Sequence, residues 1–459
     1  MRLMRKSGHQ GVRTLGPVAV AAILLAACDV TNPGPVQDEF LADPSAQLGL
    51  INGAKRVFAE NIGDIALDMG YMAREIFPGG QTGAWRTGVN MHAGHPEPGD
   101  GPGFENIHEA RFVTEVAIQR FAEVNAPANM LYGAYLWNGW AYRILGEWWC
   151  ETVLPSTDPT DRTAPEYIQG TTDPYFERAI ASFTAALGHA ANDAERHAAL
   201  AGRAQAHLWL DNHAEAAADA AAIDDEEFSF VIEQDISEED LTNYLWQGNS
   251  GTFRSYTVQF TWFYDYYTNT GDPRTPWRDG EAYQGFPFGV GSLSGFGQVP
   301  YSPQVKYADV GSDFELASYD EMQLIQAEAM LHGAVAGGVT GAMGIINAVR
   351  TSHLSDIDGL ALDPWPATTD ADEAWTYLMR ERRIELWIEA RNAPDERRWI
   401  ELGSPGTIDI PTWEDASHAG YTPHFVNYPR GLNGDETKLC FDIPDSEREQ
   451  NPNVPNAGG

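Results

Sequence analysis

Cysteine is scarce in this 459-residue sequence, which contains only Cys28, Cys150 and Cys440. None of the three has a CxxC partner or a histidine beside it, so the sequence gives no support for a zinc centre or a redox-active thiol pair. The GxSxG, HExxH, P-loop and dinucleotide-binding patterns are also missing. We therefore predict no catalytic residue and no cofactor.

Basic residues are few as well, with 29 Lys and Arg against 66 Asp and Glu, a formal net charge of −37 at pH 7. So large an anionic field repels nucleic acid, and we predict no nucleic-acid partner. The sequence is nevertheless 43% hydrophobic and 11% aromatic. This composition is typical of a folded protein and not of an acidic disordered chain.

Long apolar runs are missing after residue 27, because no later segment has the roughly 20 consecutive apolar residues that a membrane-spanning helix needs. The first 27 residues differ: a basic start is followed by a short apolar run that ends in small residues directly before Cys28. The basic residues are Arg2, Arg5, Lys6 and Arg13. This order is typical of a signal peptide and resembles the lipobox of bacterial lipoproteins. We predict that residues 1–27 are removed and that Cys28 carries lipid, palmitate included. An ordinary signal peptide with an unrelated cysteine is the alternative.

The lipid on Cys28 leaves Cys150 and Cys440. Outside the cytosol these two cysteines could form a disulfide that ties the C-terminal segment to the early helices. Two free, buried thiols are the other possibility, and the sequence leaves both open.

The pattern along the chain predicts a mainly α-helical protein. After a tether over residues 28–43, we expect a single domain over 44–459. It would hold helical hairpins over about 104–223, an irregular aromatic-rich insertion over about 224–316, helices over about 317–402, and a loop-rich tail over 403–459. Two alanine-rich stretches, FERAIASFTAAL and HAEAAADAAAI, echo one another, which suggests tetratricopeptide-like hairpins. Within these helices we place Trp137, Trp140, Trp148 and Trp209 in the core.

Aromatic residues in irregular segments are candidates for a ligand site, because a sugar ring presents an apolar C–H face that can stack on Trp or Tyr. One candidate group is Trp85 with Arg86, in a long Gly- and Pro-rich loop over residues 77–103. The other lies in residues 261–286 and comprises Tyr267, Trp277 and Tyr283. Packing is the competing interpretation for each aromatic residue. In particular, Tyr264 and Tyr266 could lie on one face of a short strand, with Trp262 in the core.

Other polar residues favour structural roles. His92 and His95 are three residues apart in the 77–103 loop, but no third ligand is placed near them, so we predict no metal site. The stretch ERRIELW, residues 381–387, has charges at helical spacing, which is typical of an exposed or half-buried helix. Arg397 and Arg398 are interpreted as packing at a helix end.

Four separated stretches, in order, resemble the SusD/RagB family of outer-membrane nutrient-binding lipoproteins. They are CDVTNPGPVQDEF after the lipobox, YDEMQLIQAEAML followed by GIINAVR, ERRIELWIEARNAPDERRW, and LCFDIPDSEREQNPNV near the end. In the third stretch, Ala390 stands where the family commonly has Gly. The resemblance implies a SusD-like helical fold with tetratricopeptide-like hairpins and large loop insertions. It also implies a non-catalytic lid, on the cell surface, that delivers a nutrient to a SusC-like TonB-dependent outer-membrane transporter.

Several alternatives stay open. The nutrient is expected to be an oligosaccharide, but a peptide or another scarce nutrient fits the sequence as well. A lipid-anchored tetratricopeptide-like scaffold that binds a protein partner is the main rival, and a lipid-anchored glycoside hydrolase is a second. Asp29, directly after the lipid cysteine, retains lipoproteins at the inner membrane in some bacteria, whereas the family resemblance favours the outer membrane.

Overall fold

The computed structural model describes residues 44–78, 91, 92, 94, 96, 101–158, 160–249, 254–280, 290–293, 297–407 and 438–455. The predicted signal peptide and the whole tether, Cys28 included, lie outside the described residues. So do Trp85, Arg86, His95 and Tyr283 of the sequence-based site predictions.

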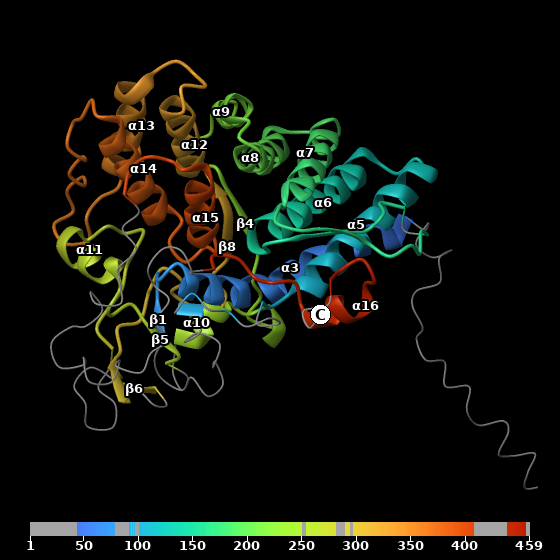
Figure 1. Cartoon of the computed structure of the whole chain (residues 1–459), viewed down its shortest axis with the longest axis horizontal. Helices are drawn as coiled ribbons and strands as arrows, with labels where there is room; N and C mark the ends of the chain where they lie inside the picture. Colours follow the sequence, from blue (N-terminus) through green and yellow to red (C-terminus); the bar gives the residue numbers. More distant parts are fainter. Residues whose placement is uncertain are drawn as a thin grey trace, which may run out of the picture.

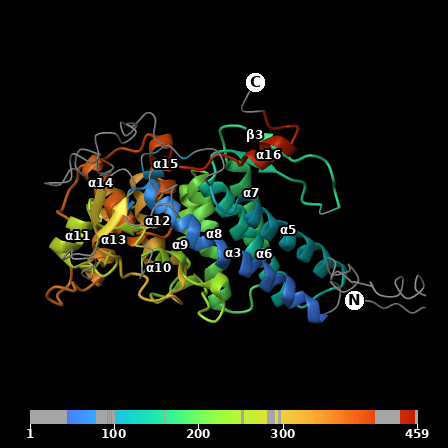
Figure 2. The same ribbon diagram turned by 90° about the horizontal axis from the view of Figure 1, so that it is seen from below.

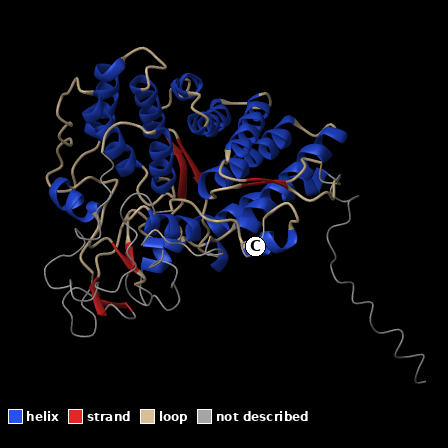
Figure 3. Ribbon diagram, in the orientation of Figure 1, coloured by secondary structure: helices blue, strands red, loops and turns tan. Residues whose placement is uncertain are grey.

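Most of the described chain is helical, and the mainly α fold is confirmed (Figure 3). After the long helix α3 (Pro44–Met72), eight helices follow in which each contacts the next. They are α5 (Phe104–Glu123), α6 (Ala128–Trp148), α7 (Asp173–Leu187), α8 (Asp193–Trp209), α9 (His213–Ala221), α12 (Tyr319–Leu331), α13 (Gly338–Ser352) and α14 (Ala371–Glu385). They run along the long axis of the molecule from α5 at one end to α13 and α14 at the other (Figures 1 and 2). This stack of neighbouring pairs is the tetratricopeptide-like arrangement that the alanine-rich repeats predict.

Polar caps fix where several of these helices begin. The side chain of Asn192 accepts a hydrogen bond from the backbone of Glu195 at the start of α8. Ser318 caps α12 in the same way, and Asp370 caps α14 by accepting from the backbone of Asp372 and Glu373. Each cap satisfies an N–H group that has no partner inside its helix.

The insertion between α9 and α12 begins and ends side by side, because its first and last strands pair with one another. Strand β4 (Ser229–Ile232) follows α9 and pairs antiparallel with β8 (Phe314–Ser318), which leads directly into α12. Between them lie the 3-10 helix η1 (Glu239–Leu241), α10 (Tyr244–Asn249) and α11 (Trp262–Thr270). Because α11 is a helix, the interpretation of Tyr264 and Tyr266 as one face of a strand is wrong.

The other strands of the described chain form short antiparallel pairs. These are β1 (Phe77–Pro78) with β5 (Tyr256–Thr257), β2 (Thr152–Leu154) with β3 (Glu166–Ile168), and β6 (Val290–Leu293) with β7 (Gly297–Pro300).

Within the helices expected over about 317–402, the last stretch is broken after α14. The chain turns at residues 386–391 and continues as α15 (Asn392–Leu402). In this turn Ile388 has φ 52° and Ala390 has φ 63°, in the left-handed region that favours glycine. The turn therefore explains why a glycine would suit position 390.

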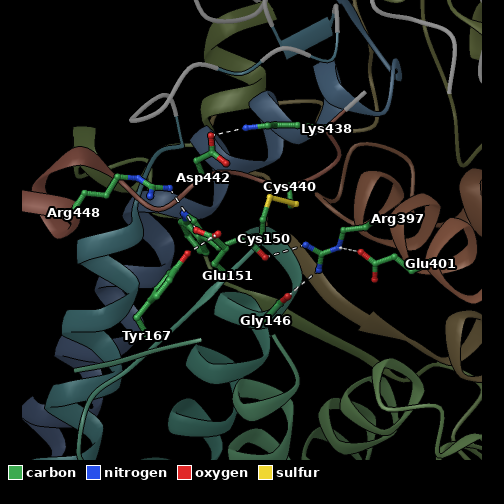
Figure 4. Close-up of a disulfide and its surroundings, with 11 residues drawn as sticks. Gly146, Cys150, Glu151, Tyr167, Arg397, Glu401, Lys438, Cys440, Asp442 and Arg448 are labelled. Carbon is green, nitrogen blue, oxygen red and sulfur yellow. Dashed lines mark hydrogen bonds and ion pairs between the residues drawn. A yellow bond between two sulfur atoms is a disulfide. The ribbon is translucent and has the colours of Figure 1, made fainter. Parts of the chain in front are cut away.

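The C-terminal segment is tied to the end of α6 (Figure 4). Cys150 and Cys440 form a disulfide across a sequence separation of 290 residues, which settles in the structure the choice that the sequence left open. Beside it, the backbone N–H of Cys150 donates to Phe441 at 2.9 Å, and that of Phe441 donates to Trp148 at 2.8 Å. The short helix α16 (Asp445–Gln450) follows, and Arg448 pairs with Glu151 at 3.5 Å.

The charged residues of the 381–398 stretch are buried, so the expectation of an exposed or half-buried helix is wrong. Arg382 lies 2.7 Å from Asp395, and Arg383 lies 3.2 Å from Glu396. Arg391 reaches Glu321 of α12 at 2.8 Å. Buried charges persist only when they are paired, and these pairs join α12, α14 and α15.

The hydrophobic core agrees with the tryptophan prediction for the most part. Trp140 and Trp148 are fully buried and Trp137 nearly so, whereas Trp209 is half-buried and stacks on Phe176 at 5.0 Å.

Candidate functional site

Helix α11 has two faces with different neighbours. Trp262, Asp265, Tyr266 and Asn269 are spaced by three, four and seven residues from the first, so they share one face. Tyr264 and Tyr267 lie on the opposite face. The first face is the one that borders open space.

A cleft of about 410 Å³ lies against this first face. Its opposite wall comes from Arg350 of α13, Trp365 of the connection between α13 and α14, and Arg380 of α14. Both views show α11 beside α13 and α14 at one end of the molecule (Figures 1 and 2). Helix α11 and the consecutive α13–α14 region thus meet at the cleft, although Tyr266 and Arg350 are 84 residues apart in the sequence.

Trp262 presents an aromatic surface in this cleft. It stacks on Tyr266 with ring centroids 4.6 Å apart and an interplanar angle of 13°, and it meets Phe263 edge-on at 5.2 Å. Among the described residues these are the rings in contact with Trp262. Its indole is half-buried, whereas Tyr266 beneath it is buried. A stacked pair of this kind, open on one side, suits the apolar face of a ring-shaped ligand.

Trp365 is held between other groups. The Arg350 guanidinium lies 4.2 Å from its ring centroid, and Tyr377 stacks on it at 5.3 Å. Its indole N–H donates to the carboxylate of Glu381 at 2.7 Å. Trp365 therefore contributes mainly a fixed wall to the cleft.

Buried charges support the cleft from behind. Arg350 donates to the hydroxyl of Tyr266 at 2.7 Å, and that hydroxyl donates to Asp272 at 2.6 Å. Burial by itself would raise the pKa of Asp272, but the adjacent Arg274 guanidinium and the Tyr266 hydroxyl lower it to about 2. Asp272 is thus an anion at neutral pH and can only accept hydrogen bonds.

The fold has close counterparts among solved structures. A SusD superfamily protein from Bacteroides thetaiotaomicron VPI-5482 aligns with a TM-score of 0.63 at 13% identity, over 90% of this chain and 99% of the other. Surface glycan-binding protein A from Bacteroides thetaiotaomicron aligns at 0.61 and 13% identity, over 88% and 96%. The chain has the SusD fold. A laminarin-binding SusD-like protein also aligns, with a TM-score of 0.55 at 14% identity, over 90% and 99%.

These likenesses bear out the resemblance carried by the four sequence stretches at the level of the fold. No protein-family model matches the sequence, and no curated protein matches it either.

Two of the predicted ligand residues lie together, but outside the cleft. Trp277 stacks on Tyr264 at 4.2 Å, and Tyr267 meets its edge at 6.0 Å. The indole N–H of Trp277 donates to the backbone of Tyr264 at 3.2 Å. Trp277 is half-buried rather than exposed, as is Tyr267, whose hydroxyl donates to Asp356 at 3.1 Å.

Sequence reasoning missed the cleft residues Trp262, Arg350, Trp365 and Arg380. The spacing of Trp262, Tyr266 and Asn269 is a helical signal that could have separated the two faces of α11. Trp365 lies in a Pro-rich connection with no periodicity, so the sequence held no comparable signal for it.

A larger cleft of about 750 Å³ runs along α3, but its chemistry is less suited to a ligand. Its cations form ion pairs, Lys55 with Glu233 at 3.4 Å and Arg56 with Glu60 at 2.6 Å, as Arg350 does with Glu381 in the α11 cleft, so the difference between the two clefts lies in their aromatic surfaces. The one tryptophan that lines it, Trp137, is almost fully buried. We therefore place the candidate site at α11.

One group in the described part of the chain has donor atoms close enough for a metal ion, namely Asp320, His353 and Glu385. His353 pairs with Asp320 at 3.1 Å. One oxygen of Glu385 accepts from Ser318 and the other from Arg274. These hydrogen bonds and charged contacts between side chains link α12, the end of α13 and α14. His92, from the predicted histidine pair, is buried, and burial lowers its pKa well below the usual value.

Among the helices that the structure describes, none has the length and apolar character needed to cross a membrane.

Proposed function

We propose that this SusD-like chain is a glycan-binding lipoprotein of the cell surface, held to the outer membrane by lipid on Cys28. It acts as the lid of a SusC-like TonB-dependent transporter and delivers oligosaccharide to it without catalysing a reaction. The observation that carries the proposal is the open Trp262–Tyr266 stack, in a cleft edged by Asp265, Asn269 and Arg380, on a SusD fold.

The cleft supports glycan over the rival ligands. Its aromatic surface matches the C–H face of a pyranose, and its carboxylate, amide and guanidinium groups match sugar hydroxyls. The solved structures of laminarin-binding and surface glycan-binding proteins with this fold add support.

Binding is tested by isothermal titration of purified mature protein with soluble polysaccharides, laminarin among them. We expect one or more glycans to bind, and Trp262→Ala to weaken that binding by about tenfold or more, since a lost aromatic contact is worth about 0.5–1.5 kcal/mol beyond the lost area. The matched variant is Trp277→Ala, because Trp277 is also half-buried but lies on the other face of α11.

Each result distinguishes one hypothesis from another. Loss of binding in Trp277→Ala but not in Trp262→Ala would move the site to the Tyr267–Trp277 group. Release of reducing ends by the purified protein would contradict the non-catalytic proposal. Circular dichroism of both variants checks that they are folded.

The partner and the membrane are tested separately, by capture of the native lipoprotein from solubilised membranes followed by mass spectrometry. Recovery of a large TonB-dependent barrel from the outer membrane is the expected result. Recovery from the inner membrane, or with soluble proteins alone, would favour the scaffold hypothesis and direct attention to Asp29.

A further inference from the structure

Glu381 of α14 lies at the centre of the wall behind the cleft. Its carboxylate is fully buried and contacts side chains from three other parts of the chain. One oxygen accepts from Arg274 at 2.7 Å. The other accepts from the indole N–H of Trp365 at 2.7 Å and lies 3.5 Å from the Arg350 guanidinium.

Two of these three groups belong to the wall of the cleft. Trp365 and Arg350 both line the cleft, and Arg350 also donates a hydrogen bond to the hydroxyl of Tyr266. Tyr266 is the ring on which Trp262 stacks. One buried carboxylate therefore contacts one wall of the cleft directly and the other through a single intermediate residue.

We propose that Glu381 is a positioning residue for glycan binding: its carboxylate sets the orientation of Trp365 and Arg350, and through them Tyr266, before the ligand arrives. This proposal rests on the proposed function, since it concerns the same cleft. Its physical basis is that a preorganised site does not have to order its side chains on binding.

Two accepting oxygens on Glu381 are essential to this role, because Arg274, Trp365 and Arg350 all donate to it. A glutamine of the same size has one accepting oxygen and one donating NH₂ group. Glu381→Gln would therefore leave either Arg274 or Trp365 facing another donor in a buried place. A hydrogen bond to a charged group is also stronger than one to a neutral group.

A neighbouring residue provides a matched control. Glu385 is one turn further along α14, is buried, and also pairs with Arg274, at 3.2 Å. Its other oxygen accepts from Ser318, and neither Ser318 nor Arg274 lines the cleft. Glu385→Gln thus disturbs the same arginine and leaves Trp365 and Arg350 in place.

The first experiment compares glycan affinities by titration with a polysaccharide that binds the wild type. We expect Glu381→Gln to weaken binding about tenfold, and Glu385→Gln to change it by less than about twofold, although both lower the thermal midpoint. Equal weakening in the two variants would overturn the proposal, since a general loosening around Arg274 would then explain both.

A double-mutant cycle with Trp365→Phe isolates the path through the indole. Phenylalanine keeps an aromatic ring but has no N–H to donate to Glu381. If Glu381 acts by holding Trp365, then Glu381→Gln should cost less affinity in the Trp365→Phe background than in the wild type. If the effects of the two substitutions on affinity are fully additive, Glu381 does not act through the indole of Trp365.

A measurement on the protein without ligand tests the role of Glu381 independently of the proposed function. The protein is labelled with 5-fluorotryptophan, and the ¹⁹F signal of Trp365 is assigned by its loss in Trp365→Phe. We expect this signal to shift or broaden in Glu381→Gln and to stay unchanged in Glu385→Gln. An unchanged signal in both would overturn the positioning role, whereas failure of every glycan to bind the wild type would overturn the proposed function alone.

Discussion

Glu328 of α12 shows what the buried charges do at the scale of a residue. Its carboxylate is fully buried and accepts from Arg398 and, at 3.2 Å, from the indole N–H of Trp399. Burial by itself would raise the pKa of Glu328, but Arg398 and Arg382 lower it to about 2. Glu328 is thus an anion at neutral pH, paired with Arg398.

We predict that Glu328→Gln lowers the free energy of unfolding by about 3–5 kcal/mol at pH 7, because it leaves the buried Arg398 with incomplete compensation. Urea denaturation measures the change. The control is Asp193→Asn, which breaks the exposed pair with Arg196 and should cost less than about 1 kcal/mol. A similar small cost for both variants would show that Asp395, the other partner of Arg398, is sufficient.

The sequence predicts a structural role for these charged residues, but it does not predict that they are buried or which residues pair with them. The stretch over 381–398 has charges at helical spacing, which usually marks an exposed face. The partners that neutralise it, Glu321 and Glu328, are more than 50 residues earlier in the chain. No local sequence pattern predicts an ion pair between residues so far apart in the chain.

At the scale of elements, three helices approach closely around one phenylalanine. Phe183 of α7 lies between Gly139 of α6 and Gly202 of α8. A Cβ atom added at Gly139 would be 2.7 Å from the Phe183 ring, and one added at Gly202 would be 2.3 Å from it. The glycines thus provide the room that lets the aromatic side chain fill the junction.

We predict that Gly202→Ala destabilises the protein by about 1–3 kcal/mol, because the methyl group would overlap the Phe183 ring in a packed core. The matched control is Gly53→Ala in α3, where an added Cβ meets no atom within 4 Å. That variant should gain about 0.5–1 kcal/mol from helix propensity alone. Thermal denaturation of both tests the prediction, and a neutral or stabilising Gly202→Ala would contradict it.

Elements with a clear period were predictable, and those set by distant contacts were not. The periodic stretches predict helical hairpins over about 104–223, where the structure has α5 to α9, because a 3.6-residue period of apolar residues indicates a helix with one buried face. By contrast, the turn at 386–391 depends on Glu75, which accepts from the backbone of Ile388 at 2.6 Å and from Asn392 at 2.7 Å. Glu75 is more than 300 residues away from that turn.

At the scale of the molecule, the cleft exists only because the insertion brings α11 back to the far end of the helical stack. One wall includes Trp262 of α11, and the other consists of Arg350, Trp365 and Arg380 from the consecutive α13–α14 region. The sequence predicts ligand contacts from aromatic residues of 261–286, and this stays a prediction. Of those candidates, Tyr267 lies on the face of α11 opposite the cleft and Trp277 packs against that face. The sequence could not separate the two faces, because the position of α13 and α14 relative to α11 depends on the whole fold.

The pH dependence of stability is also a property of the whole molecule. Burial raises the pKa of Glu75 and of Glu389 to about 8, and that of Glu396 to about 7. Since a raised pKa means that the folded state holds the proton more tightly, the stability from these groups is fully present below about pH 4.5 and is lost as the pH rises through 7 to 8. Asp272 and Glu328, with pKa values of about 2, contribute the opposite dependence, because their stabilisation is lost as the pH falls from about 4 toward 2.

We therefore predict a maximum in the free energy of unfolding between about pH 4.5 and 7, measured by urea denaturation across the pH range. The alkaline decline should be shallower in Glu75→Gln, because glutamine mimics the protonated acid and still accepts from Ile388 and Asn392. Self-repulsion of a chain with net charge −37 also grows with pH, but this substitution leaves it nearly unchanged, so the difference between the two profiles isolates the buried carboxyl. Parallel profiles for wild type and Glu75→Gln would show that Glu75 is already ionised in the folded protein, with Arg383 as its counterion.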